Sequence, residues 1–241
     1  MKVIVKKDYE NMSKEAANII KKEIEKKPDI VLGLATGSTP IGMYEELIRL
    51  HKEEGLDFSK VTTFNLDEYV GIDKDHPNSY HYFMKDVFFD HINIDMDNTF
   101  IPDGKAEDPE SYCKEYDKLI DEKGGVDVQI LGIGENGHIA FNEPAEKLNV
   151  GTSIVKLTQS TIEANSRFFD SMDEVPKTAI TMGIGSIMKA KKIILLANGK
   201  KKAKAIKELI KGDKITTYLP ASMLLLHSDV TIIVDEEAYN G

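Results

Sequence analysis

The residues best suited to chemistry follow an apolar run at positions 126–133, which predicts a buried strand. Three glycines stand at the end of this run, and glycine lets the backbone bend close to a bound molecule. His138 and Glu143 come next, and a histidine beside a carboxylate can transfer protons. The pattern therefore indicates a candidate proton-transfer pair. A structural histidine held in a loop is the alternative.

The spacing of Gly132, Gly134 and Gly137 also matches the G-x-G-x-x-G turn of dinucleotide-binding proteins. That turn needs a helix straight after the glycines and an acidic residue about 20 positions further on. Here His138 and a Phe-Asn-Glu-Pro stretch at 141–144 follow, and proline discourages a helix. The next predicted strand ends without an acidic residue, so we exclude a dinucleotide site.

A second group of polar residues follows the apolar strand predicted at 30–35. Hydroxyl groups and free backbone amides at a helix N-terminus suit a phosphate or carboxylate, although helix capping alone is the alternative. Thr39 is predicted as the N-cap and Pro40 as the first helical residue. The turn lacks the Gly-Lys-Ser/Thr of a P-loop, which argues against a nucleoside triphosphate. The candidate anion site comprises Thr36, Gly37, Ser38 and Thr39, with Arg167 and the lysines at 200–202, including Lys202, as candidate cations.

A pair of acidic residues, Asp67 and Glu68, follows the strand predicted at 61–66. Such a pair can be a helix start or a surface feature. A carboxylate in a closed pocket can instead remove a proton from a carbon next to a carbonyl, once desolvation raises its pKa. The six histidines form neither an i, i+4 pair nor a Cys/His cluster, so no metal site is expected.

The elements that must position these groups alternate along the chain. This rhythm predicts an α/β fold, with a mostly parallel sheet, helices on both faces, and the carboxyl ends of the strands at one shared edge. Ser13, Pro40, Pro77 and Pro109 are expected to mark four helix starts. Strands are predicted at 3–5, 30–35, 61–66, 126–133, 153–157, 178–182, 192–197 and 230–234, and later helices at 159–168, 184–189 and 200–210.

The composition limits the class of protein. The 241 residues contain 41% hydrophobic residues and no linker-like stretch, which favours one domain over residues 1–241. No apolar run approaches the roughly 20 residues needed to cross a bilayer. The single cysteine, Cys113, excludes an internal disulfide and suits a reducing cytoplasm. A net charge of -10 argues against nucleic acid or an anionic membrane as partner, but not against a small anionic substrate.

Four segments together resemble the glucosamine-6-phosphate deaminase family, and the match runs from the first strand to the last. They are residues 34–40, 63–69, 132–144 and 164–170, of which Asp-Glu-Tyr and Phe-Asn-Glu-Pro are the most specific. The resemblance implies a single-domain Rossmann-like fold that works without a cofactor. It also implies conversion of D-glucosamine 6-phosphate and water into D-fructose 6-phosphate and ammonium, in amino-sugar catabolism.

The resemblance assigns roles to individual residues. Asp67 matches the base that moves a proton between C2 and C1 of the opened sugar. His138 matches the group that opens the pyranose ring, with Glu143 as its supporting carboxylate. Many members carry Asp where this chain has Asn136, and we expect the amide oxygen of Asn136 to orient the imidazole. The 6-phosphate cradle is expected to comprise Thr36, Gly37, Ser38, Thr39, Arg167 and Lys202.

Regulation and the competing functions are the remaining expectations. Some relatives are hexamers activated by N-acetylglucosamine 6-phosphate through basic residues after Phe-Asn-Glu-Pro and a longer C-terminal tail. Residues 145–155 hold few cations here and the chain stops at Gly241, so we expect no such activation and a monomer or small homo-oligomer. The alternatives are a 6-phosphogluconolactonase, from which Tyr69 and Glu143 distinguish the chain, and a non-catalytic sugar-phosphate sensor.

Overall fold

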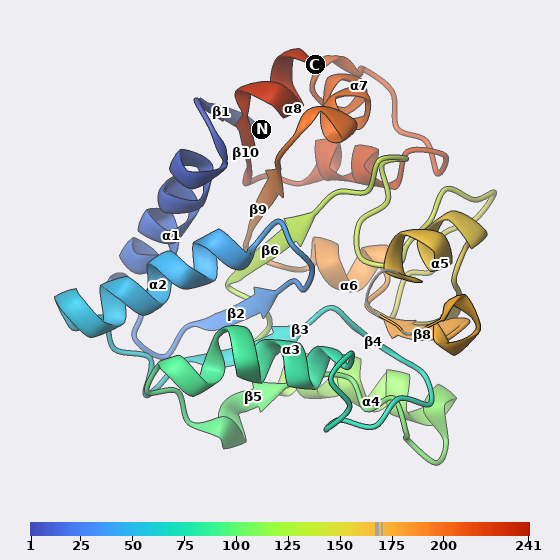
Figure 1. Cartoon of the computed structure of the whole chain (residues 1–241), viewed down its shortest axis with the longest axis horizontal. Helices are drawn as coiled ribbons and strands as arrows, with labels where there is room; N and C mark the ends of the chain where they lie inside the picture. Colours follow the sequence, from blue (N-terminus) through green and yellow to red (C-terminus); the bar gives the residue numbers. More distant parts are fainter. Residues whose placement is uncertain (167–168, 170) are drawn as a thin grey trace.

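Within the residues that the computed structural model describes, 1–166, 169 and 171–241, seven parallel strands form one sheet in the order β1-β10-β9-β6-β2-β3-β5 (Figure 1). The central strands are buried on both faces, as their continuous apolar sequences predict. The strands are β1 Lys2–Lys6, β2 Val31–Leu34, β3 Thr62–Asn65, β5 Thr99–Phe100, β6 Val128–Gly132, β9 Lys192–Ala197 and β10 Val230–Asp235.

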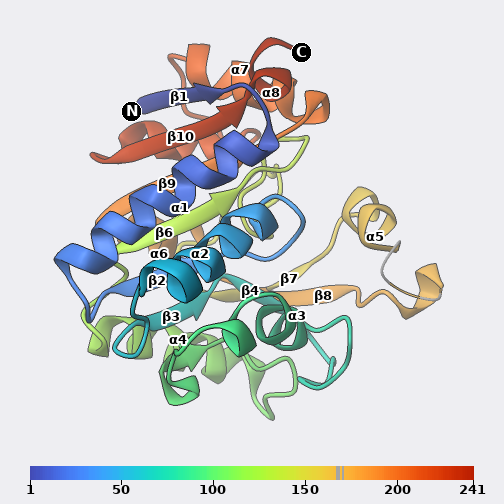
Figure 2. The same ribbon diagram turned by 60° about the vertical axis from the view of Figure 1, so that its left-hand side comes forward.

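Helices cover both faces of this sheet, so the predicted α/β class is confirmed. Figures 1 and 2 show α1, α2 and α3 on one face, and α4, α6 and α7 on the other. Among the described residues, no helix is both long and apolar enough to cross a membrane. The helices are α1 Tyr9–Lys26, α2 Ile41–Glu54, α3 Tyr80–Val87, α4 Pro109–Glu122, α5 Gln159–Asn165, α6 Ile184–Met188, α7 Ala203–Lys211 and α8 Glu236–Asn240.

A second, antiparallel sheet departs from the sequence prediction. It joins β4 (Asp67–Tyr69), β8 (Thr178–Thr181) and β7 (Ser153–Lys156), with Asp67 opposite Thr181. The chain changes sheets at Leu66, whose N–H donates to Leu34 O (3.3 Å) and whose O accepts from Met182 N–H (2.8 Å). The strand end predicted after residue 66 is therefore the start of a new strand, and this strand carries Asp67.

Three predicted helix starts are wrong in detail. Asp8, and not Ser13, caps α1 by accepting from Asn11 N–H (2.8 Å), and Ser13 is buried inside the helix. Helix α3 starts at Tyr80 with Ser79 as its N-cap, because the hydroxyl of Ser79 accepts from the third residue of the helix while Pro77 lies outside. The start of α4, with Asp108 as N-cap and Pro109 as first residue, is confirmed.

The third wrong start concerns α2. Its first residue is Ile41 and its N-cap position is Pro40, which has no capping side chain. Thr39, the predicted cap, instead donates its hydroxyl to Asn198 Oδ1 at 2.8 Å. Two later helices also differ: residues 200–202 form a 3₁₀ turn before α7, and α5 ends at Asn165, so that positions 167 and 168 of the predicted helix lie outside the described residues.

Candidate active site

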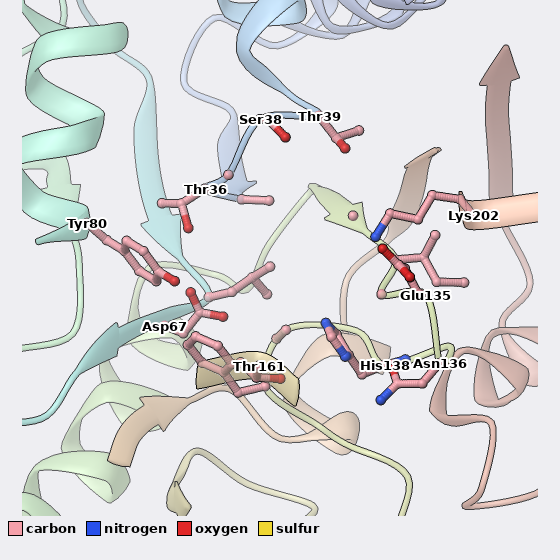
Figure 3. A pocket seen from close by; sticks show the side chains of 18 residues that line it. Thr36, Ser38, Thr39, Asp67, Tyr80, Glu135, Asn136, His138, Thr161 and Lys202 are labelled. Atoms are coloured by element: carbon pink, nitrogen blue, oxygen red, sulfur yellow. Dashed lines mark hydrogen bonds between the residues drawn. The ribbon is translucent and has the colours of Figure 1, made fainter. Parts of the chain in front are cut away.

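A cavity of about 450 Å³ lies at the carboxyl ends of β2, β3 and β6, within the usual range of small-molecule sites. The strand ends singled out in the sequence meet here, as the shared edge of a parallel sheet requires. Asp67 and His138 line the same cavity although they are far apart along the chain. Figure 3 shows them on one side, with Ser38, Thr39 and Lys202 along the other.

Asp67 is a buried carboxyl group that opens onto the cavity. Its exposed fraction is 7%, and no hydrogen bond to its carboxylate comes from any described residue. Burial, and secondly the charge of Glu68, raise the pKa of Asp67 to about 8. A carboxyl group with a pKa near neutrality can both take up and release a proton at physiological pH.

Glu68 has a different role from its neighbour. Its carboxylate is 1% exposed and accepts from the N–H groups of Tyr69 (2.9 Å), Tyr80 (2.8 Å) and His81 (3.1 Å). Two of these N–H groups belong to the first turn of α3, where a carboxylate is favoured. Of the two readings of the acidic pair, the helix start therefore applies to Glu68 and the cavity group is Asp67.

His138 lies in the loop after β6 and its position depends on Gly134. Gly134 N–H donates to His138 O at 2.9 Å, which closes the loop. A Cβ atom on Gly134 would lie 2.3–2.5 Å from atoms of the imidazole ring, so the ring occupies the space that a side chain would need. Nδ1 is 3.2 Å from Glu143 Oε1, an ion-pair distance, although the two groups are not aligned as a hydrogen bond.

Glu143 stands behind the imidazole, where polar side chains surround it. Its Oε2 accepts from Asn136 Nδ2 (2.7 Å), and its Oε1 accepts from Thr161 Oγ1 (2.5 Å). Burial acts to raise the pKa of Glu143, but His138, Thr161 and Asn136 outweigh it and lower that pKa to about 2. The carboxylate is therefore ionised beside the imidazole at neutral pH.

The expected contact between Asn136 and the imidazole ring is wrong. The amide oxygen of Asn136 accepts from the backbone N–H of His138 (3.2 Å), and the amide nitrogen donates to Glu143. Asn136 therefore fixes the loop and the carboxylate, and acts on the ring only through Glu143. The reason is geometric, since a side chain two residues before His138 reaches its main chain more easily than its ring.

Thr161 is a site residue that the sequence did not reveal. Thr161 lies in the first turn of α5, is 8% exposed and lines the cavity. Its link to Glu143 spans 18 residues of loop and strand and leaves no periodic or motif signal. The one available signal was chemical, since a buried carboxylate needs a hydroxyl or N–H donor close to it.

Thr161→Val is expected to destabilise the protein by about 1–3 kcal/mol at pH 7, because a hydrogen bond to a charged, largely buried group is lost. The pKa of Glu143 in the folded protein, about 2, lies below its ordinary value of 4.5. The ionised carboxylate therefore contributes stability that is complete above about pH 4.5 and is lost as the pH falls through about 2. The difference between variant and wild type should therefore shrink over this range in urea unfolding at a series of pH values. Thr161→Ser keeps the hydroxyl and serves as control, and a pH-independent difference would contradict the assignment.

The other side of the cavity, called the anion side below, carries hydroxyl, N–H and ammonium groups that suit an anion. Thr36, Gly37, Ser38 and Thr39 all line it, and within the described part of the chain the N–H groups of Gly37 and Ser38 have no backbone acceptor. Lys202 lines the same side. Arg167, the other candidate cation, lies outside the described residues.

The 3₁₀ turn that ends in Lys202 is anchored at its start by the end of the neighbouring strand β10. It follows Gly199, whose N–H donates to both carboxylate oxygens of Asp235 at 3.0 Å. Asn198 accepts from Thr39, so one turn contacts both parts of the anion side. In the part of the chain that is described, no three His, Cys, Asp or Glu side chains converge as metal ligands would.

Comparison with known proteins adds an independent observation. A family model for glucosamine-6-phosphate isomerases and 6-phosphogluconolactonases matches residues 6–233. The glucosamine-6-phosphate deaminase of Thermoanaerobacter sp. (strain X514) is 62% identical over 99% of this chain and 94% of its own. That of Clostridium perfringens (strain SM101 / Type A) is 59% identical over 99% and 98%.

Solved structures agree with this result. A structure described as a monomeric glucosamine-6-phosphate deaminase has a TM-score of 0.96 and 51% identity, covering 99% of this chain and 98% of its own. A 6-phosphogluconolactonase from Thermotoga maritima has a TM-score of 0.75 and 22% identity over 97% and 98%, which shows a shared fold.

Proposed function

Because the chain belongs to the family of glucosamine-6-phosphate isomerases and 6-phosphogluconolactonases, we propose that it is a glucosamine-6-phosphate deaminase. It converts D-glucosamine 6-phosphate and water into D-fructose 6-phosphate and ammonium. The observation that carries this function is one cavity with two separate proton carriers, Asp67 and the His138–Glu143 pair, opposite a turn of hydroxyl and N–H groups.

The phosphate group is bound on the anion side of the cavity. Ser38 and Thr39 offer hydroxyl and backbone N–H groups just before α2, and Lys202 adds positive charge. This grip fixes the sugar at the end remote from the reaction, which places C1 and C2 near the proton carriers. Arg167 is part of the proposed cradle by sequence alone.

Ring opening is the task of His138. The imidazole takes the proton of the C1 hydroxyl and returns a proton to the ring oxygen, which breaks the C1–O5 bond and frees the aldehyde. Glu143 carries a negative charge 3.2 Å from Nδ1 and stabilises the imidazolium that forms between these two transfers.

Asp67 then carries the isomerisation. Its carboxylate removes the proton from C2 while O1 takes up a proton from the ammonium group of the substrate, which gives an enolamine. The proton taken from C2 is then delivered to C1, which leaves an iminium group at C2. Water adds to this iminium group and nitrogen departs as ammonium, leaving the ketone of fructose 6-phosphate. The pKa of about 8 suits both the removal and the delivery of the proton.

Measuring products distinguishes this function from its alternatives. We expect purified protein to release equal amounts of ammonium and fructose 6-phosphate from glucosamine 6-phosphate, and not to hydrolyse 6-phosphogluconolactone at a comparable rate. The lactonases show the shared fold at 22% identity, whereas the 51–62% identical relatives are deaminases. Lactone hydrolysis without ammonium, or sugar-phosphate binding without any turnover, would overturn the proposal.

The enzyme is expected to act as a monomer with hyperbolic kinetics and no response to N-acetylglucosamine 6-phosphate. Residues 145–155 contain one lysine and no arginine, so they offer little charge for a second sugar phosphate. A relative at 51% identity is described as monomeric. Light scattering and rates with and without the acetylated sugar check this, and sigmoidal kinetics relieved by that sugar would contradict it.

A further inference from the structure

Tyr9, the first residue of α1, contacts the turn at residues 36–39 from outside the cavity. Its hydroxyl donates to Ser38 O at 3.0 Å and accepts from Gly42 N–H at 2.8 Å. The two partners lie on either side of the start of α2. One phenol group therefore connects the turn to the helix that follows it, and Tyr9 does not line the cavity.

The start of α2 needs such an external partner. Pro40, its N-cap residue, has no side-chain acceptor, and the hydroxyl of Thr39 is directed to Asn198. An unpaired N–H in the first turn of a helix is unfavourable, and the phenol oxygen of Tyr9 satisfies that of Gly42. Tyr9 thus provides the acceptor for the first turn of α2 that the sequence analysis expected from Thr39.

Helix α1 can approach the start of α2 closely because residue 42 is a glycine. A Cβ atom there would lie 3.0 Å from Tyr9 Cε1 and 2.6 Å from Ser13 Oγ. Any side chain would push α1 away and lengthen both hydrogen bonds of Tyr9. Only glycine at position 42 therefore leaves enough space for the phenol ring of Tyr9 to contact the start of α2.

We propose that Tyr9 is a positioning residue for phosphate binding, which it supports by fixing the peptide between Ser38 and Thr39. A trans peptide is planar and its C=O and N–H point in opposite directions, so holding Ser38 O toward Tyr9 turns the N–H of Thr39 away from Tyr9. Thr39 lines the cavity. Tyr9 touches no substrate and acts only through this turn.

Loss of the Tyr9 hydroxyl is expected to weaken phosphate binding because the turn is then no longer pre-organised. Donors that are fixed before the ligand arrives need no ordering on binding, which strengthens the complex. Without the phenol hydroxyl, the peptide after Ser38 can rotate and must be ordered by the phosphate itself. Binding of the phosphate group should weaken, while the proton carriers on the far side of the cavity keep their positions.

The test is Tyr9→Phe, which removes the hydroxyl and keeps the ring. Titration calorimetry should show about three- to tenfold weaker binding of inorganic phosphate and of fructose 6-phosphate, the range for loss of one or two hydrogen bonds. KM for glucosamine 6-phosphate should rise by the same factor, with kcat changed less than about twofold. For glucosamine, which lacks the phosphate, kcat/KM should not change.

The control is Tyr112→Phe on α4, which removes a hydroxyl group that accepts from the N–H of Asp103 (3.0 Å), away from the turn at 36–39. It should leave all these values unchanged. Gly42→Ala is the second variant and should weaken anion binding in the same direction as Tyr9→Phe. Unaltered anion binding in Tyr9→Phe, or an equal loss with glucosamine, would overturn the proposal, as would a wild type that binds neither anion.

The inference rests on the proposed function but can fail separately from it. Anion binding is measured without turnover, so a protein that releases no ammonium yet loses phosphate affinity in Tyr9→Phe would refute the function and leave the role of Tyr9. A protein that releases ammonium and binds anions equally well in both forms would refute the role of Tyr9 alone.

Discussion

Asp67→Asn is expected to lower kcat/KM by about a hundred- to ten-thousandfold, the usual contribution of a general base. The amide has nearly the same shape but cannot accept the C2 proton. The binding of fructose 6-phosphate should change little, because the anion side of the cavity is untouched. Ammonium release at pH 8.5 and calorimetry measure the two effects, and a variant with more than about a tenth of wild-type kcat/KM would exclude Asp67 as the base.

The proposed role of Asp67 also predicts how the activity of the wild type depends on pH. The carboxylate must be ionised to remove a proton, and burial raises the pKa of Asp67 to about 8. We therefore expect kcat/KM to fall about tenfold for each pH unit below about 8. If kcat/KM instead began to fall only near pH 4, the ordinary range of a carboxyl group, Asp67 would not be buried in solution.

Asp67→Asn should also raise stability at alkaline pH. The folded pKa of about 8 exceeds the ordinary 3.8, so the stability contributed by the bound proton is complete below about pH 4 and lost as the pH rises through about 8. Asparagine has no charge to desolvate. Above pH 8 the variant should therefore be more stable in urea unfolding, by on the order of a few kcal/mol, and this advantage should disappear at pH 4.

Gly134→Ala is expected to lower kcat/KM by about a hundredfold although it adds one methyl group. The new Cβ would lie 2.3–2.5 Å from the ring of His138, so the imidazole must move. Its contact with Glu143 Oε1 is already 3.2 Å long, and a shift of about 1 Å would separate the pair. The ring can move toward the cavity, so stability should change by less than about 1 kcal/mol.

A double variant shows whether the methyl group acts through the ring. With His138→Ala there is no imidazole to displace, so adding Gly134→Ala should cost nothing further. Independent, multiplicative losses would mean that the alanine disturbs the loop in another way. The four rates of ammonium release form a complete cycle and decide between these outcomes.

The sequence predicted correctly that the polar residues which follow apolar strands would lie close together. Asp67, His138 and Thr39 each follow such a strand, and a parallel sheet brings strand ends to one edge. Those predictions needed only local patterns and a single rule of topology. The α/β class followed from the same alternation of strands and helices.

The errors share a different cause, which is contact between distant segments. Three residues, Asp67–Tyr69, are too few to show a period, and their partner strand β8 lies more than 100 residues away. Thr39 is a good N-cap by local rules, but Asn198 competes for its hydroxyl. Tyr9 and Thr161 have no motif of their own, since each acts on a residue in another element.

The burial of Asp67 has a further consequence, for the approach of the substrate. The protein carries a net charge of -10, and its long-range field repels a sugar phosphate in solution. Below about pH 8 Asp67 is a neutral acid because burial raises its pKa, which removes one negative charge from the end of the diffusion path. The encounter rate should accordingly decline as the solution becomes more alkaline, and added salt should screen this decline.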